Sequence, residues 1–284
     1  MCRNGVHFNF DIKLFPSFNV IRKYVIMNKI KIVGLKKRFD EGRWISNELD
    51  LSIPAGKTTC IIGQSGEGKS VLLKQIIGLI EPDAGSIFVD DVDIVPLKGI
   101  ARENNFKKFG YVFQFAALLD SLSVFENVGI VDLENGANPE TVRAKVQEKL
   151  SMVNLREDTI DKFPAELSGG MKKRVGLART LMGNPEIILY DEPTTGLDPI
   201  TSGVVHELIA DMQKKLKITS VVISHDVEIF KFVDYVALLY QGKIVSVVDA
   251  ATIWESKDPY IYQFIRGLTD GPIHQEIPDD KNKM

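Results

Sequence analysis

Hydrophobic and polar positions along the first part of the chain follow a strand pattern that one helix interrupts. Short strands are predicted for IKIVGL at 30–35, ELDLSI at 48–53 and TTCII at 58–62, which glycine-containing turns separate. After Lys69 the apolar residues of VLLKQIIGLI take helical spacing, and the turn EPDAG ends that segment. SIFVD and KFGYVF then return to the strand pattern, so this region predicts strands packed around one helix.

From about residue 115 to residue 184 the pattern is helical. Val142, Val146, Leu150 and Val153 recur at steps of four, four and three residues, which places them on one face of an amphipathic helix. Core packing alone accounts for this apolar stripe. The segment predicts a helical lobe inserted into a strand-rich domain.

Strands resume with EIILY at 186–190, a continuous apolar run typical of a strand buried on both faces. Asp198 is suited to be the N-cap of the next helix, with Pro199 at its first position. TSVVIS, VDYVALLY and KIVSVV are the further strands that complete the sheet. The residues expected on the buried face of the helix after Asp198 are Val205, Leu208, Ile209, Met212 and Leu216.

The order of these elements predicts an α/β fold in one domain, residues 27–250, with a helical subdomain at about 115–184. The strands before and after the helical part need each other to form a sheet, which favours one domain over two. A C-terminal helical segment at 251–268 and an extended tail at 269–284 follow.

Residues 1–26 are expected to be an N-terminal extension. They lack the continuous apolar core of a signal peptide. Met27 begins MNKIKIVGL, an alternating strand that is typical of a domain start. We therefore expect translation to begin at Met27 and the upstream residues not to be native.

Composition excludes several classes of protein. The 284 residues are 44% apolar and 26% charged, as in ordinary globular chains, and the formal charge of −3 gives no reason to expect nucleic acid as a partner. Cys2 and Cys60 offer neither a disulfide framework nor a metal-ligand spacing. No apolar run approaches the ~18 residues that span a bilayer, so we expect membrane contact only through a partner.

The octapeptide GQSGEGKS at 63–70 matches the phosphate-binding P-loop, with the apolar strand before it and the helix after it that the motif requires. Its backbone N–H groups are expected to surround phosphates at the helix N-terminus, Lys69 to reach the β and γ oxygens, and Ser70 to hold Mg²⁺. The residues expected to contact nucleotide here are Gly63, Gln64, Ser65, Gly66, Glu67, Gly68, Lys69, Ser70 and Val71.

Two acidic residues end the buried strand in IILYDE. Asp191 can hold Mg²⁺ through its water shell, and Glu192 is placed to polarise an attacking water. Strand ends are often acidic without any function, but the P-loop makes the catalytic interpretation stronger.

A second candidate anion site is the turn in ELSGGMKKR, where Ser168, Gly169 and Gly170 lead into a helix. With it, Gln114 in YVFQF, Asp198 in TTGLDP and His225 in VVISHD complete a set of six motifs. In this order and spacing they resemble the nucleotide-binding domain of ABC transporters over about residues 29–250.

This resemblance implies a P-loop NTPase fold with a RecA-like core, an antiparallel β-subdomain and an inserted helical subdomain. It implies ATP and Mg²⁺ as ligands, with Gln114 also near the metal. It further implies a head-to-tail dimer, in which Ser168 and the N–H of Gly170 contact the γ-phosphate bound by the partner subunit. Glu192 would orient or deprotonate the water, and His225 would stabilise the γ-phosphate.

The adenine is expected to stack on an aromatic residue near the start of the domain. Phe39, about 24 residues before the P-loop, is the first candidate and Trp44 is its rival. Core packing is an equally good explanation for either ring.

Longer segments indicate which group of ABC transporters the chain resembles. GKSVLLKQIIGLIEPDAGSI, YVFQFAALLDSLSVFENV, LSGGMKKRVGLART and QFIRGLTDGPI are similar to the ATPase subunits of Mla and Mce type lipid transporters, with Met171 in place of the usual Gln. This resemblance implies that the cargo is phospholipid or another hydrophobic lipid and that the protein is located at the cytoplasmic face of the bacterial inner membrane. The implied partners are a transmembrane permease, a lipid-binding Mce-domain protein and a STAS-domain subunit.

Three other classes of ABC protein share part of this pattern. An ATPase subunit for uptake of amino acids or other small solutes would share every catalytic motif, so it is the alternative hypothesis for the function. A ribosome- or DNA-acting ABC protein would have two nucleotide-binding domains or a long coiled-coil insertion, and a non-hydrolysing module would have lost Lys69, Glu192 or His225. Leu118, Leu119, Val124 and Phe125 are candidates for a permease-binding surface or, equally, for core.

Overall fold

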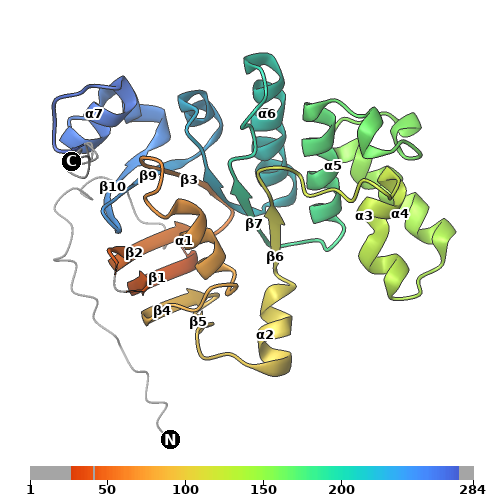
Figure 1. The fold of residues 1–284 in the computed structure, drawn as a ribbon, viewed down its shortest axis with the longest axis horizontal. Coiled ribbons are helices and arrows are strands. Elements are labelled where there is room, and N and C mark those ends of the chain that lie inside the picture. Colours follow the sequence, from red (N-terminus) through yellow and green to blue (C-terminus); the bar gives the residue numbers. More distant parts are fainter. Residues whose placement is uncertain (1–26, 41, 275–284) are drawn as a thin grey trace, which may run out of the picture.

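The computed structural model describes residues 27–40 and 42–274. The expectations for residues 1–26 and 275–284 lie outside this part of the chain. Two sheets and a helical lobe make up the described molecule (Figure 1). Among the described residues, no helix combines the length and the apolar character needed to cross a membrane.

The smaller sheet is antiparallel and has the order β2-β1-β4-β5. Its strands are β1 (Asn28–Arg38), β2 (Trp44–Pro54), β4 (Ala84–Val89) and β5 (Val92–Asp93). Alternate residues of β1 point into the core, as the alternating sequence predicts, and Ile30, Ile32 and Leu35 are buried.

The larger sheet has the order β10-β9-β3-β8-β7-β6. Its strands are β3 (Thr58–Ile62), β6 (Phe109–Val112), β7 (Ile187–Asp191), β8 (Thr219–Ile223), β9 (Tyr235–Tyr240) and β10 (Lys243–Asp249). All neighbours are parallel except β10, which runs antiparallel to β9. In parallel strands the carboxyl ends meet at one edge, which brings the loops after β3, β6, β7 and β8 together.

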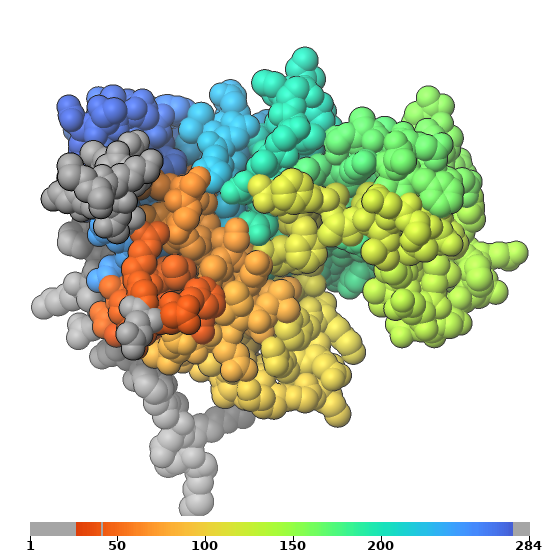
Figure 2. All heavy atoms as spheres, viewed as in Figure 1, coloured from red at the N-terminus to blue at the C-terminus, as the bar shows by residue number. Residues whose placement is uncertain are grey.

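The helices lie on the larger sheet, in the lobe at one side of it or, for α2, at the edge of the molecule beyond β6 (Figure 1). They are α1 (Lys69–Ile76), α2 (Gly99–Phe106), α3 (Val124–Glu134), α4 (Pro139–Met152), α5 (Gly169–Leu181), α6 (Pro199–Leu216) and α7 (Pro259–Arg266). Short 3₁₀ turns are Glu157–Thr159, Pro164–Glu166, Val227–Phe232 and Ala250–Glu255. Figure 2 shows the α3–α5 lobe in green at one side of the molecule, opposite the orange antiparallel sheet.

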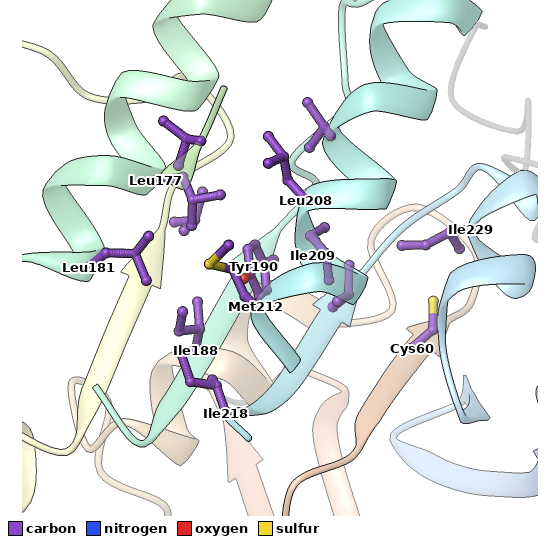
Figure 3. Packing of buried hydrophobic residues seen from close by; sticks show 14 of the residues in the cluster. Cys60, Leu177, Leu181, Ile188, Tyr190, Leu208, Ile209, Met212, Ile218 and Ile229 are labelled. Carbon is purple, nitrogen blue, oxygen red and sulfur yellow. The ribbon is translucent and has the colours of Figure 1, made fainter. Parts of the chain in front are cut away.

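The main core lies where α5 and α6 pack on β7. Leu177 and Leu181 of α5 lie on one side of Tyr190 of β7, and Leu208 of α6 lies on the other (Figure 3). Met212 of α6 lies beside Tyr190 in the same view. A second cluster fills the space between α1 and the antiparallel sheet. The two cores fix α5, α6 and the carboxyl ends of the parallel strands relative to one another.

The buried stripes follow the sequence prediction with one exception. Val142, Val146 and Leu150 are buried on α4. On α6 the predicted residues Val205, Leu208, Ile209 and Met212 are buried. Leu216 is 43% exposed, so its placement in the core was wrong. Leu216 is the last residue of α6, and Lys217 turns the chain towards β8 with φ 55°, so the final turn leaves the core.

Candidate functional site

The P-loop connects β3 to α1, and two of its glycines are needed for close packing. At Gly63, a Cβ would lie 2.4 Å from the Leu239 carbonyl oxygen of the neighbouring strand. At Gly68, the N-cap of α1 with φ 92°, it would lie 2.3 Å from a methyl group of Ile45. Any side chain at either position would push the loop away from the sheet.

Lys69, the first residue of α1, is buried against the P-loop. Its Nζ donates to the carbonyl oxygens of Gly63 at 2.9 Å and Gln64 at 2.8 Å. Burial lowers the pKa of Lys69, and the charges of Glu192, Glu67 and Asp191 oppose that shift. The ammonium group is therefore held at the centre of the loop, where phosphate oxygens can replace its carbonyl partners.

Glu67 has a different part in the loop from its neighbours. Its carboxylate is buried and accepts from the Gln241 N–H at 2.7 Å, in the turn between β9 and β10. The side chain ties the P-loop to the sheet, so a contact of Glu67 with nucleotide would have to come from its backbone.

Ser70 and Asp191 meet as the sequence predicts. The Ser70 hydroxyl donates to Asp191 Oδ1 at 2.7 Å, and the Tyr111 hydroxyl donates to Asp191 Oδ2 at 2.9 Å. Burial and the Asp191 charge raise the pKa of Tyr111, so the phenol remains a donor. A hydroxyl and a carboxylate fixed beside a P-loop are hard oxygen ligands of the kind Mg²⁺ prefers.

Glu192 is the centre of a polar cluster. Its Oε2 accepts hydrogen bonds from Gln114 Nε2 at 3.0 Å and from the Thr195 hydroxyl at 2.8 Å. His225 Nε2 lies 3.1 Å from its Oε1. Its backbone has φ 49°, a left-handed conformation that a residue with a side chain rarely adopts. Three elements thus bring the predicted catalytic residues together at the carboxyl ends of β6, β7 and β8.

The turn around Ser168 begins α5. The Ser168 hydroxyl accepts from the Met171 N–H at 3.3 Å as N-cap, and Ser168 and Gly169 are exposed. Gly170 is buried, and a Cβ there would lie 2.4 Å from a methyl group of Thr201. Asp198 accepts from the Thr201 N–H at 3.0 Å as N-cap of α6, so the two predicted motifs lie against each other.

The two adenine candidates lie outside the apolar core of the described residues. Phe39 is 49% exposed, with Lys37 Nζ 5.4 Å from its ring centroid, which excludes core packing for this ring. Trp44 is half-buried, and the Arg38 guanidinium lies 4.9 Å from its ring. The adenine contact of either ring remains a prediction.

Sequence reasoning missed four residues of this region. Tyr111, Thr195 and Lys173 contact Asp191, Glu192 and the backbone of Gln114, respectively, and Arg43 donates to the Gly66 carbonyl at 2.8 Å. Tyr111 lies in the predicted strand KFGYVF, and Thr195 and Lys173 lie in TTGLDP and ELSGGMKKR. The sequence alone does not show which strands are neighbours or which side chains meet, so these contacts were not predicted.

A P-loop beside paired acidic residues at strand ends defines a nucleotide-binding ATPase. Residues 46–195 match the family model described as ABC transporter. The chain belongs to the ABC transporter family and is an ATP-hydrolysing member of it. This confirms the fold class and the family resemblance inferred from the motifs.

Two relatives and one solved structure are similar over most of their length. The probable ribonucleotide transport ATP-binding protein mkl of Mycobacterium leprae is 37% identical over 257 residues, 90% of this chain and 74% of that protein. The intermembrane phospholipid transport ATP-binding protein MlaF of Haemophilus influenzae is 38% identical over 254 residues, 88% of this chain and 95% of that protein. A dimeric ATP-binding cassette in a post-hydrolysis state with ADP and Pi matches with TM-score 0.71 and 30% identity, covering 78% of this chain and 98% of that chain.

Proposed function

We propose that this chain is the ATPase subunit of a transporter that moves phospholipids or related hydrophobic lipids. It would act as a head-to-tail dimer bound to a transmembrane permease at the cytoplasmic face of the bacterial inner membrane. The observation that carries the lipid cargo is the 38% identity to MlaF of Haemophilus influenzae, which extends over 95% of that protein. A lipid-binding Mce-domain protein and a STAS-domain subunit are the further partners we propose.

The hydrolysis step follows from the cluster around Glu192. Its carboxylate orients the water or accepts its proton for in-line attack on the γ-phosphate, while His225 and Lys69 stabilise the charge that develops on the phosphate oxygens. Ser70 and Asp191, with Gln114 nearby, would hold Mg²⁺, which supplies further charge neutralisation at the β and γ oxygens.

The head-to-tail dimer is supported by the position of the Ser168 turn. Ser168 and Gly169 are exposed, and Figure 1 shows α5 in the helical lobe, apart from the P-loop helix α1 beside the antiparallel sheet. Helix N-termini bind anions through free N–H groups, so this turn can complete the phosphate site of a second copy. The similar ADP-bound structure is itself a dimer.

Two variants test the dimer. Ser168→Arg is expected to abolish hydrolysis while ATP binding to the monomer survives, because the long cation blocks only the partner's site. Met171→Gln should stay active, since it leaves the backbone donors of the turn unchanged. Normal phosphate release by Ser168→Arg would contradict the head-to-tail arrangement.

The permease is proposed to contact the segment after Gln114. Phe115 is 80% exposed, and Phe113 and Leu119 are also exposed, which supports a partner surface. Val124, in contrast, is fully buried, and Leu118 and Phe125 pack against the core. Leu119 is therefore the one exposed residue among the four candidates Leu118, Leu119, Val124 and Phe125.

A small-solute transporter is the second candidate, because the mkl name specifies ribonucleotides, and amino-acid uptake shares the same motifs. Purification of the native complex, followed by mass spectrometry of bound lipids and identification of the permease, separates the two. Phospholipid in the complex is the expected result. A permease of the amino-acid type without bound lipid would contradict the lipid proposal.

A further inference from the structure

The segment that carries Gln114 has an unusual backbone. Ala116 and Ala117 follow it with φ values of 56° and 48°, two consecutive residues in the left-handed region. Such conformations cost free energy in residues other than glycine and persist only where the surroundings hold them. The contacts around this segment therefore decide where Gln114 lies.

Helix α5 supplies those contacts. Arg179 donates from Nη1 to the Ala117 carbonyl at 2.7 Å and from Nη2 to the Ala116 carbonyl at 2.8 Å. One turn earlier, Gly176 lets the segment approach so closely that a Cβ there would lie 3.2 Å from the Ala116 carbonyl oxygen. The left-handed pair is thus clamped to one face of α5.

Lys173 extends this clamp to Gln114. The lysine is 8% exposed, and its Nζ donates to the Gln114 carbonyl oxygen. Burial lowers the pKa of Lys173, and the charge of Glu192 opposes that shift. The side chain of the same glutamine donates to Glu192 at 3.0 Å.

Lys173 lies five residues after Ser168, about 7.5 Å along the helix axis at 1.5 Å per residue. The exposed Ser168 turn forms the N-terminal end of α5. Further along the same helix, Lys173 and Arg179 bind the segment that carries Gln114, whose side chain contacts Glu192. A shift of α5 must move Gln114 with it, because one side-chain hydrogen bond joins α5 to the Gln114 carbonyl and two more join it to the carbonyls of Ala116 and Ala117.

We propose that Lys173 is a positioning residue that couples the Ser168 turn to Gln114 and Glu192 of its own subunit. The link between the two nucleotide sites rests on the proposed head-to-tail dimer, in which the Ser168 turn serves the partner's ATP. Binding at that turn then aligns Glu192 in the subunit that supplies the turn. The positioning of Gln114 itself needs no dimer.

The test compares Lys173→Met with Lys173→Arg in the full chain, with Lys172→Met as control. Met cannot donate to the Gln114 carbonyl, whereas Arg can. Lys172 is the adjacent lysine on α5 and has no side-chain hydrogen bond or ion pair within the described residues. Phosphate release is measured against ATP concentration to obtain kcat, KM and the Hill coefficient.

The expected result for Lys173→Met is a kcat lower by about 10-fold or more, since misplacing a catalytic group by an ångström has effects of this size or larger. KM should stay within about 2-fold, and any cooperativity in ATP should fall. Lys173→Arg should recover most of kcat, and Lys172→Met should match the parent. Normal kcat in Lys173→Met, or an equal loss in both methionine variants, would overturn the proposal.

Lys173→Gln provides the same test if the methionine variant does not fold, because it removes the charge and shortens the donor while remaining polar. Its kcat should also fall without a matching change in KM, and an unchanged kcat would overturn the proposal. The dimer proposal and the positioning proposal are contradicted by different results. Normal hydrolysis by Ser168→Arg would disprove the head-to-tail site, while a kcat loss in the Lys173 variants would still support local positioning of Gln114.

Discussion

At the scale of single residues, the backbone of Glu192 places its carboxylate among three polar side chains at the cost of a left-handed φ of 49°. Strain of this kind is retained only where packing or function compensates for it. The conformation, together with Gln114 and His225, supports the role of general base that the sequence predicts for Glu192.

Glu192→Gln tests that role. The amide has nearly the same shape but does not accept a proton, so turnover should fall by about 10² to 10⁴, while ATP binding is retained. Single-turnover phosphate release and nucleotide binding are the two measurements. Asp191→Asn is the matched comparison, in which the Mg²⁺ dependence should change as well. A Glu192→Gln turnover within a few-fold of the parent would exclude general-base catalysis by this residue.

His206 on α6 is buried, and neither ring nitrogen has a hydrogen-bond partner among the described residues. Burial lowers its pKa below the ordinary value of 6.5, while the charges of Asp226 and Glu228 oppose the shift. The unfolded chain then binds a proton more readily than the folded protein. His206 therefore makes the protein less stable as pH falls below about 6.5.

His206→Leu should remove this pH dependence. The free energy of unfolding, measured in urea at about pH 7.5 and about pH 5.5, should fall less between the two conditions in the variant than in the parent. The quantity to compare is the change in the free energy of unfolding between the two pH values. The effect of the substitution on packing is the same at both pH values and cancels in this difference. Equal pH-dependent losses in both proteins would show that His206 is protonated as readily in the fold as in the unfolded chain.

Residues within continuous motifs were predictable, whereas those that meet through tertiary structure were not. The P-loop, Asp191 and Glu192 stand in short patterns with strands or helices on defined sides. Thr195 and Lys173 stand within TTGLDP and ELSGGMKKR, but neither motif predicts their contacts, which arise only when α5 and the loop after β7 pack beside the Gln114 segment. A lysine on a helix is ordinarily taken as solvated, and nothing local marks Lys173 as buried.

At the scale of elements, apolar periodicity predicted helices and strands well where one face is buried. Helix α4 carries a buried stripe, and its predicted residues lie in the core. Helix α2, Gly99–Phe106, was not predicted, and none of its residues is buried. A helix without an apolar face leaves no periodic signal in the sequence.

Leu150→Ala on α4 and Leu216→Ala on α6 make the same chemical change at a buried and an exposed helical position. The first should lower the free energy of unfolding by about 2 to 5 kcal/mol through lost burial and a residual cavity. The second should cost about 1 kcal/mol or less, because Leu216 is partly in water already. Denaturant unfolding of the two variants provides the comparison, and equal losses would contradict the assignment of Leu216 to the surface.

At the scale of the whole molecule, the sheets, the inserted lobe and the family were predictable because the motif order matches an ABC nucleotide-binding domain. The packing of the chain after α7 was not. Residues 269–274 lack regular secondary structure, as the composition predicts, yet Ile273 is buried. Burial of a single apolar residue in an irregular segment leaves no periodic pattern in the sequence.

The contact that holds this segment is Gln263 of α7, whose amide side chain pairs with the backbone of Ile273 in both directions. Gln263 Nε2 donates to the Ile273 carbonyl at 2.9 Å, and the Ile273 N–H donates to Oε1 at 2.7 Å. Gly271 lies so close that a Cβ there would be 2.4 Å from the same amide oxygen. The His274 N–H further donates to the Tyr240 hydroxyl of β9 at 3.1 Å.

Gln263→Ala should release this segment while leaving the ATPase core folded. Loss of both partners leaves two buried backbone groups of Ile273 unpaired, which costs about 1 to 3 kcal/mol. Hydrogen exchange at the Ile273 amide should accelerate by about 5-fold or more, because 1.4 kcal/mol corresponds to a factor of ten, and exchange in β3 and β7 should not change. Lys257→Ala, at an exposed position before α7, is the control and should leave Ile273 protected. Unchanged exchange at Ile273 in Gln263→Ala would mean that the burial of its side chain, rather than the amide pairing, anchors the end of the domain.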